Sequence, residues 1–275
     1  MMASKKEAEQ TVKLEYMDEK TIALLHLNRP LRRNALNNSS IAHLQHALEK
    51  LKASKTVRAL ILLGNGPDFC AGADLEWMKE SIGHTREENV ADAKTLATVF
   101  QTLQSFPVPT IAVAHGSVFG GGLGLVACCD LVLASAEVKF CFSEVKLGLV
   151  PAIIAPFVAQ VMPVRTMQRY CLTAEAFGAE QGWRCGLVHE VYPEAALLGE
   201  AIAFARRLRE NGPIAVLETK ALLHRLRQTD KSPQSTVIAD MVQKIAEIRV
   251  SSEAQEGMSA FFEKRTPAWG AHQDV

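Results

Sequence analysis

The sequence predicts an α/β fold, with a mixed core followed by a helical C-terminal region. In the first 150 residues, short apolar runs typical of strands alternate with stretches whose apolar residues recur at helical spacing. After about residue 150 the pattern becomes helical. No fixed-period repeat and no low-complexity linker divides the chain. We therefore expect one folded unit, with the core in residues 1–195 and the helical region in residues 196–275.

The first half of the chain supplies the strands. Residues 12–27 alternate enough to predict a hairpin that turns near Asp18, and Asn28-Arg29-Pro30 ends its second strand. Behind candidate caps at Asn37–Ser40, apolar residues at helical spacing predict a helix that extends to about residue 51. Further strands are expected at 57–63, 109–114, 131–133 and 140–142, and further helices at 85–106 and 121–129.

The second half supplies helices, which are expected at 152–162, 164–172, 175–185, 195–211, 213–228, 233–250 and 252–264. The apolar stretch Leu147–Met162 is shorter than the roughly 20 residues that a membrane-spanning helix needs, and prolines interrupt it. Met1–Gln10 is charged and lacks the apolar segment of a secretory signal. We therefore expect a cytoplasmic protein with no membrane partner.

Composition excludes several classes of partner. Hydrophobic residues make up 48% of the 275 residues, which is enough for a large core. The 30 basic and 30 acidic residues cancel, so no net charge favours nucleic acid, and the lysines of His43–Arg58 fit a solvated helix face better than an RNA surface. The six cysteines and the histidines show no metal-ligand spacing, so we expect reduced thiols and no metal site.

Two turns made of small residues lie about fifty residues apart, and each follows a strand-like run. One is Phe69-Cys70-Ala71-Gly72-Ala73-Asp74, and the other is Phe119-Gly120-Gly121-Gly122-Leu123-Gly124. Because such turns carry no bulky side chain, a ligand can approach their backbone N–H groups closely. Two N–H groups directed at one oxygen form an oxyanion hole. The pair of turns therefore indicates a site that polarises a carbonyl group.

The glycine run does not match the common glycine-rich motifs of nucleotide-binding proteins. A dinucleotide-binding G-x-G-x-x-G would need glycine where the chain has Leu125, and a P-loop would need a Gly-Lys-Ser/Thr that is absent. No G-x-S-x-G sequence offers a serine nucleophile. A tight strand-to-helix turn with close packing remains the alternative for this segment taken alone.

A single acidic residue, Glu144, follows the strand-like Phe140-Cys141-Phe142. If it is enclosed its pKa is perturbed, as a catalytic acid requires, whereas the alternative is a surface glutamate beside Lys146. Asp74 is interpreted as a residue that caps a helix or closes a turn more readily than as a catalytic group. Trp77 and Met78 fit either an acyl pocket or the core.

Taken together, these motifs resemble the crotonase (enoyl-CoA hydratase/isomerase) superfamily, from about residue 12 to 269. The resemblance depends on motifs that occur in one order, none of them specific alone. They are Asn28-Arg29-Pro30 with Asn34-Ala35-Leu36, the turn 69–74, Gly116–Asp130, Ser143–Gly148, Leu172-Thr173, Gly186-Leu187-Val188 and Glu256–Phe261. The resemblance implies a crotonase-like ββα spiral core with a C-terminal helical trimerisation region, and an acyl-CoA thioester as substrate with no separate cofactor.

The resemblance also implies roles for individual residues. The thioester oxygen is expected between the N–H groups of Ala73 and Gly121, with Glu144 as the acid/base. Arg33 is a candidate for a CoA phosphate, and Phe261 and Lys264 match positions that reach a neighbouring subunit's CoA in homotrimers or dimers of trimers. The full set of expected substrate-binding residues is Leu31, Arg32, Arg33, Ala71, Asp74, Leu75, Trp77, Gly120, Gly124, Pro151, Phe261 and Lys264.

One position departs from the family pattern. Hydratases of this family usually carry a second glutamate where this chain has Gly124. The segments 72–79 and 143–152 look like bacterial methylglutaconyl-CoA hydratases of leucine degradation, which also carry glycine there. The first interpretation is therefore hydration of 3-methylglutaconyl-CoA. The alternatives are an enoyl-CoA isomerase that uses Glu144 alone and, in another class, a non-catalytic acyl-CoA-binding subunit.

Overall fold

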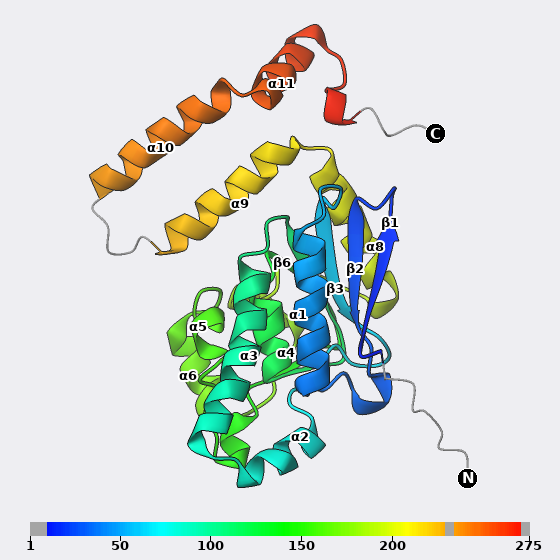
Figure 1. The fold of residues 1–275 in the computed structure, drawn as a ribbon, viewed down its shortest axis with the longest axis vertical. Coiled ribbons are helices and arrows are strands. Elements are labelled where there is room, and N and C mark those ends of the chain that lie inside the picture. Colours follow the sequence, from blue (N-terminus) through cyan, green and yellow to red (C-terminus); the bar gives the residue numbers. More distant parts are fainter. Residues whose placement is uncertain (1–9, 229–233, 271–275) are drawn as a thin grey trace.

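The computed structural model describes residues 10–228 and 234–270, so the N-terminal segment expected to lack a signal lies largely outside it (Figure 1). The strands are β1 (Val12–Met17), β2 (Ile22–Leu27), β3 (Ala59–Gly64), β4 (Thr110–Ala114), β5 (Ser117–Phe119), β6 (Leu131–Ser135), β7 (Lys139–Cys141) and β8 (Glu190–Tyr192). The α-helices are α1 (Asn38–Lys52), α2 (Leu75–Glu80), α3 (Arg86–Gln104), α4 (Gly121–Ala127), α5 (Ala155–Val158), α6 (Val164–Thr173), α7 (Ala179–Arg184), α8 (Glu194–Arg209), α9 (Pro213–Gln228), α10 (Gln234–Arg249) and α11 (Ser252–Glu263).

Six strands form the main sheet in the order β1-β2-β3-β4-β6-β8, with β1 antiparallel to β2 and the other neighbours parallel. The expected hairpin is confirmed, since Val12 pairs with Leu27 and the turn residues at 18–20 have positive φ. Strands β2, β3 and β4 are buried along their whole length, which is why they appear in the sequence as continuous apolar runs. Strands β5 (Ser-Val-Phe) and β8 (Glu-Val-Tyr) were not expected, because each is short and begins with a polar residue, so neither forms an uninterrupted apolar run.

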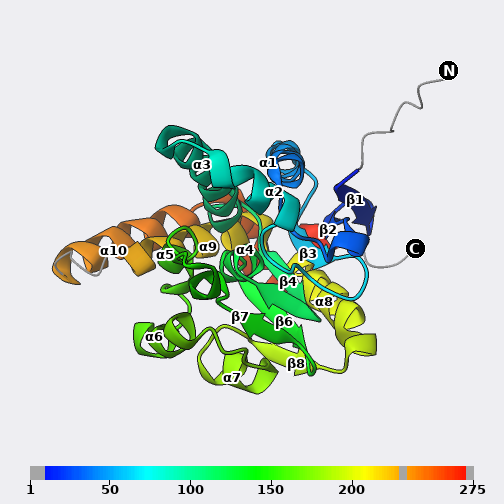
Figure 2. The same cartoon turned by 90° about the horizontal axis from the view of Figure 1, so that it is seen from below.

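Helices cover both faces of this sheet (Figures 1 and 2). Alternate side chains of β2 point to opposite faces, so Leu25 packs with α1, α3 and α4, whereas Ile22 packs with α8. Helix α8 contributes Leu197, Ala201 and Ala205 to the second layer, so it belongs to the sheet structure. Helices α9, α10 and α11 extend away from it in Figure 1. The domain division at 195/196 stays a prediction.

The C-terminal helices are largely where the sequence predicts them. The exception is the expected helix 152–162, which contracts to the four-residue α5, because Pro156 lies in its first turn and Pro163 follows it. Helix α2 was missed as an element. The first residue of the expected helix 233–250 lies outside the described residues. Among the described residues, no helix is both long and apolar enough to cross a membrane.

Candidate active site

A second, two-stranded sheet connects the glycine turn to Glu144. Strands β5 and β7 run parallel, and their last residues, Phe119 and Cys141, are register partners. The N–H of Gly120 donates to the carbonyl oxygen of Cys141 at 3.1 Å. The backbone after β5 therefore lies beside the backbone after β7, where Glu144 begins a 3-10 turn that ends at Leu147.

The other small-residue turn joins the same place from the opposite side of β5. The N–H of Cys70 donates to Ser117 and the N–H of Phe119 donates to Cys70, both at 2.9 Å. Gly72 and Gly120 have φ of 98° and 46°, which side chains rarely adopt. A Cβ placed on Gly120 would lie only 3.9 Å from Gly72 Cα. The two turns, distant in sequence, are thus adjacent in space.

Four backbone N–H groups in these turns have no acceptor among the described residues: those of Gly72, Ala73, Gly121 and Gly122. Of these four residues, Gly72 and Gly122 are buried, whereas Ala73 and Gly121 are not. Leu36 donates to the Gly72 carbonyl at 2.7 Å and accepts from the Asp74 N–H at 2.8 Å, so the N–H of Ala73 between them points away from Leu36. Gly121 is the first residue of α4, where no partner within the helix exists. Ala73 is exposed, so a ligand can reach it. This arrangement suits a carbonyl oxygen that gains negative charge.

The carboxylate of Glu144 lies next to the glycine turn. Its Oε1 would be 3.3 Å from a Cβ placed on Gly120, and its Oε2 is buried without a hydrogen-bond partner among the described residues. Burial raises the pKa of Glu144 above its ordinary value of 4.5. Glu144 is therefore half-buried instead of lying on the surface beside Lys146. A carboxylate with a raised pKa and an unused oxygen is suited to exchanging protons with a ligand.

Two thiols near Glu144 are poor nucleophiles. The pKa of Cys171 is raised to about 11 and that of Cys141 is also raised, in both cases mainly by burial, with the negative charge of Glu144 adding to the effect. Neutral thiols are weak nucleophiles, because the thiolate is the reactive form. The ionisable groups around the glycine turn thus leave Glu144 as the proton carrier.

The position of the absent second glutamate is filled by apolar side chains. A Cβ placed on Gly124 would lie 2.7 Å from Ile154 Cγ2 and 2.7 Å from Phe100 Cζ, so even a methyl group has no room there. The sequence shows that a glutamate is missing but not that its space is occupied. Phe100 and Ile154 were not among the expected site residues, because their apolar character indicates only the core.

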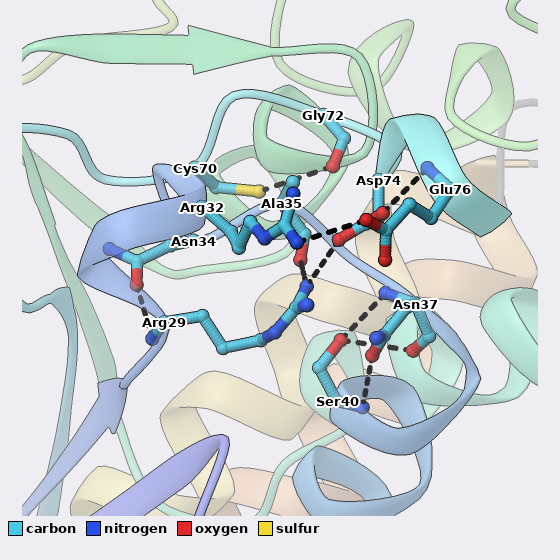
Figure 3. A network of polar contacts seen from close by, with 10 residues as sticks. All are labelled: Arg29, Arg32, Asn34, Ala35, Asn37, Ser40, Cys70, Gly72, Asp74 and Glu76. Carbon is cyan, nitrogen blue, oxygen red and sulfur yellow. Dashed lines mark hydrogen bonds and ion pairs between the residues drawn. The ribbon is translucent and has the colours of Figure 1, made fainter. Parts of the chain in front are cut away.

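Asp74 has the capping role that its sequence context favours. Its Oδ1 accepts the N–H of Glu76 at 2.8 Å at the start of α2, and its Oδ2 accepts from Arg29 at 2.7 Å (Figure 3). The sequence pointed to Arg29 only as part of a motif. The structure shows it as the buried partner of Asp74.

The residues expected along CoA lie on the loop before α1. Leu31 is almost fully exposed, and Arg32 pairs with Glu76 at 3.0 Å on the surface. The guanidinium of Arg33 binds Asp68 at 2.7 and 3.0 Å and Ser117 Oγ at 2.5 Å. This pairing holds the pKa of Asp68 at about 2. Binding of a CoA phosphate by Arg33 stays a prediction. Such a phosphate would share the Arg33 guanidinium with Asp68.

The remaining expected residues divide into a near and a distant group. Ala71, Leu75 and Trp77 lie in or directly after the first turn, with Leu75 exposed and Trp77 partly buried against the core. Phe261 and Lys264 belong to the end of α11, which Figure 1 shows at the opposite end of the molecule from α2. Within one chain they are therefore not brought to Glu144. Pro151, also expected, accepts the N–H of Ala155 in the connection to α5.

A cavity in the described structure lies apart from the residues around Glu144. A cavity of about 480 Å³ lies between α9 and the residues near β4 and β6, and none of the expected site residues lines it. In the described part of the chain, no three His, Cys, Asp or Glu side chains gather as metal ligands.

Comparison with known proteins agrees with this geometry. The sequence model of the enoyl-CoA hydratase/isomerase family matches residues 17–272. The chain is 31% identical over 258 residues to a crotonyl-CoA hydratase of Syntrophomonas wolfei, which covers 90% of this chain and 94% of that protein. It is 30% identical over 251 residues to a 2,3-dehydroadipyl-CoA hydratase of Escherichia coli, covering 90% and 95%.

A solved structure has the same fold. The crystal structure of an enoyl-CoA hydratase from Shewanella pealeana superposes with a TM-score of 0.89 at 38% identity, covering 94% of this chain and 96% of that one. Similarity of this extent covers both the sheet core and the helices that follow it. The expected α/β fold, with its C-terminal helical region, is confirmed.

Proposed function

The chain belongs to the enoyl-CoA hydratase/isomerase family, and from this premise we propose that it adds water across the 2,3 double bond of an enoyl-CoA thioester. The observation that supports this reaction is the arrangement around Gly120. The N–H groups of Ala73 and Gly121 and the Oε2 of Glu144 have no hydrogen-bond partner among the described residues, and they occur in segments that lie side by side. The two N–H groups stabilise a developing oxyanion, and the carboxylate of Glu144 moves a proton.

The reaction follows from these groups. Glu144 takes a proton from water as the hydroxyl oxygen bonds to C3, and the electron pair of the double bond moves to the thioester oxygen as an enolate. The N–H groups of Ala73 and Gly121 stabilise that oxygen, and losing one such donor typically costs about 3–4 kcal/mol of transition-state stabilisation. The proton on Glu144 then passes to C2, which restores the thioester. In this proposal the reaction uses no separate cofactor, because the CoA is part of the substrate.

A single carboxylate carries both proton transfers in this proposal. No second acid is available at position 124, where Phe100 and Ile154 occupy the space. These apolar side chains keep that side of the site dry, which strengthens the electrostatic effect of the N–H groups. The activity is expected to rise with pH through an apparent pKa above 4.5, because Glu144 must be ionised to accept a proton.

The finer part of the proposal is the substrate, 3-methylglutaconyl-CoA of leucine degradation. It is supported by the resemblance of segments 72–79 and 143–152, with Gly124 matching the glycine seen there. Its distal carboxylate requires a cation, for which Lys79 is the candidate, since it is exposed and forms no ion pair with the described residues. The relatives named above act on other acyl chains by their names, so the acyl group needs its own test.

Turnover of three thioesters tests the proposal. Purified enzyme is given 3-methylglutaconyl-CoA, crotonyl-CoA and a 3-enoyl-CoA, and products are identified by mass and NMR. Addition of water to 3-methylglutaconyl-CoA with the highest kcat/KM supports the full proposal. Faster hydration of crotonyl-CoA supports the proposed hydration reaction but contradicts 3-methylglutaconyl-CoA as the preferred substrate. Binding of every thioester with turnover of none points to a non-catalytic acyl-CoA-binding subunit.

A second candidate is an enoyl-CoA isomerase, which the filled space at Gly124 favours. A double-bond shift needs one proton carrier, and Glu144 alone supplies it. In deuterated water the isomerase moves the double bond and incorporates deuterium without adding oxygen. The hydratase adds about 18 mass units in ordinary water, which is the mass of one water molecule.

We also propose a homotrimer, or a dimer of trimers, in which α11 of one subunit lies near the CoA of another. Phe261 and Phe262 are each about four-fifths exposed in one chain, and α10 exposes Ile238, Val242 and Ile245. Such apolar exposure is typical of a surface that another subunit covers. Analytical ultracentrifugation tests the assembly, and a monomer at micromolar concentration contradicts it.

A further inference from the structure

Two charged side chains are buried next to Ala73, one of the two proposed oxyanion donors. The side chains of Arg29 and Asp74 are only 6% and 4% exposed, and Arg29 Nη1 lies 2.7 Å from Asp74 Oδ2. Taking two charges out of water is costly, and replacing such a pair by apolar residues of similar size often costs a fold no stability. A stabilising role is therefore a weak explanation for the presence of this pair.

Through Arg29 and Asp74, the ion pair connects the backbone at Ala35 with the start of α2 (Figure 3). The same Nη1 of Arg29 donates to the carbonyl oxygen of Ala35 at 2.7 Å. The other oxygen of Asp74 holds the N–H of Glu76 at the start of α2. Arg29 thus holds the backbone at Ala35 and also holds Asp74, the residue directly after Ala73.

Between these two anchors, Leu36 and Ala73 form an isolated parallel bridge. Leu36 donates to Gly72 and accepts from Asp74, which sets the plane of the chain on both sides of Ala73. An isolated bridge has no neighbouring ladder to fix it, so its twist depends on what holds its ends. The Arg29–Asp74 contact closes one end. At the other end, Ala71 N–H donates to the Arg33 carbonyl oxygen at 2.9 Å, and Gly72 makes the turn with a φ of 98°.

We propose that the buried Arg29–Asp74 ion pair is a positioning device for the oxyanion hole, which holds the Leu36–Ala73 bridge in the twist that directs the Ala73 N–H at the thioester oxygen. This inference rests on the proposed function. Neither side chain is required to touch substrate in this role. A displacement of the donor by about 1 Å is enough to reduce turnover by about 100-fold.

Three variants and one matched control test the device. Arg29→Met removes the pair and Asp74→Asn removes the charge but retains an N-cap oxygen. Arg29→Lys keeps the charge with a shorter reach. Glu76→Gln is the control, because Glu76 lies on α2, the helix that Asp74 caps, and the change breaks its exposed pair with Arg32 without touching the buried pair.

Two measurements are made on the folded fraction of each protein. Steady-state kinetics separates kcat from KM, and isotope-edited infrared spectroscopy records the ¹³C-labelled thioester carbonyl of bound butyryl-CoA, which has no double bond to hydrate. We expect Arg29→Met and Asp74→Asn to lower kcat by about 10- to 100-fold with smaller changes in KM. We expect the carbonyl stretch to move back toward its frequency in free butyryl-CoA, Arg29→Lys to recover part of both effects, and Glu76→Gln to match the wild type.

The outcomes separate a positioning role from a purely structural one. Variants that lose thermal stability but keep wild-type kcat and the wild-type carbonyl shift overturn the inference. If Arg29→Met does not fold, the comparison of Arg29→Lys and Asp74→Asn with Glu76→Gln decides it by the same two readouts. If the wild type neither binds butyryl-CoA nor shifts its carbonyl, the proposed function itself fails, and that result is distinct from a shift that the variants retain.

Discussion

Asp74 and Glu144 are two carboxylates on neighbouring segments, and they differ in how many hydrogen-bond partners surround them. Burial raises the pKa of Asp74, but hydrogen bonds from Arg29 and from the backbone N–H groups of Glu76 and Trp77 outweigh it, so the net pKa lies below the ordinary value. Glu144 is desolvated without such partners for its Oε2, and its pKa is raised. A carboxylate whose oxygens are all engaged holds structure in place, whereas one with an oxygen unused remains available for chemistry.

The largest expected effect is on activity at Glu144. Replacing Glu144 by Gln keeps the shape but removes the proton carrier, so kcat is expected to fall by about 10²- to 10⁴-fold. The carbonyl shift of bound butyryl-CoA is expected to remain, because the two N–H groups are unchanged. Steady-state kinetics and infrared spectroscopy on the same preparation provide the measurement, and near-normal kcat contradicts the role of Glu144.

The same variant is expected to be as stable as the wild type, or more stable, at neutral pH. Because the folded state raises the pKa of Glu144, ionisation of this group disfavours folding as pH rises above 4.5, and below that value the penalty disappears. Urea unfolding of the variant and the wild type at about pH 7 and about pH 4 measures this difference in the free energy of unfolding. A clear loss of stability at neutral pH would mean that the Glu144 carboxylate has a partner.

The next largest effect is on stability at Asp74. Asp74→Ala removes the carboxylate that pairs with the buried Arg29 and also removes the cap of α2, so we expect a loss of about 3–5 kcal/mol. Urea unfolding followed by circular dichroism measures the change. The control Glu76→Gln, which breaks an exposed ion pair, is expected to cost less than about 1 kcal/mol. Equal losses in the two variants would remove the contrast between buried and exposed pairs.

A smaller effect tests the apolar wall beside the proposed acid. Gly124→Ala places a methyl group 2.7 Å from both Phe100 and Ile154, so we expect a loss of about 1–3 kcal/mol by overpacking. Gly199→Ala in α8 is the matched control, since a Cβ there meets nothing within 4 Å, and it is expected to stabilise by up to about 1 kcal/mol. A Gly124→Ala protein as stable as the Gly199→Ala protein would show that position 124 has room.

The smallest effect concerns Asp68, a second paired carboxylate. Its pKa is lowered from 3.8 to about 2, chiefly by the hydrogen bond from Arg33. A lowered folded-state pKa contributes stability that is complete above about pH 4 and is lost as pH falls toward about 2. We expect the contribution to be about 1 kcal/mol, because Arg33 is more than half exposed. Asp68→Asn should flatten the pH dependence of unfolding in that window, and an unchanged slope contradicts this.

Much of the fold is encoded locally and was predictable for that reason. The capping box between Asn37 and Ser40 sets the start of α1, and Thr85 with Glu88 does the same for α3. Apolar runs predicted the buried strands. The short elements β5 and α2 escaped, because three to six residues barely display a period and neither segment is an uninterrupted apolar run. The equally short β7 was expected from the apolar residues at 140–142.

The candidate site was predictable in its residues but not in its surroundings. The motifs pointed to Ala73, Gly121 and Glu144 one by one. They did not reveal that Phe100 and Ile154 fill the space at Gly124, or that Arg29 holds Asp74. These contacts join residues that lie between about twenty-five and forty-five positions apart in the chain, so no local pattern records them.

The sequence alone thus determined the hairpin, the order of the longer strands and helices, the caps and the two small-residue turns, because spacing and backbone preference act over a few residues. The tertiary structure decided which polar groups are satisfied and which are not. The pairing of β5 with β7 brings Glu144 to the glycine turn, and folding pairs Asp74 while leaving Glu144 Oε2 without a partner among the described residues. Whether a buried charge finds a partner depends on residues that meet only when the chain is folded.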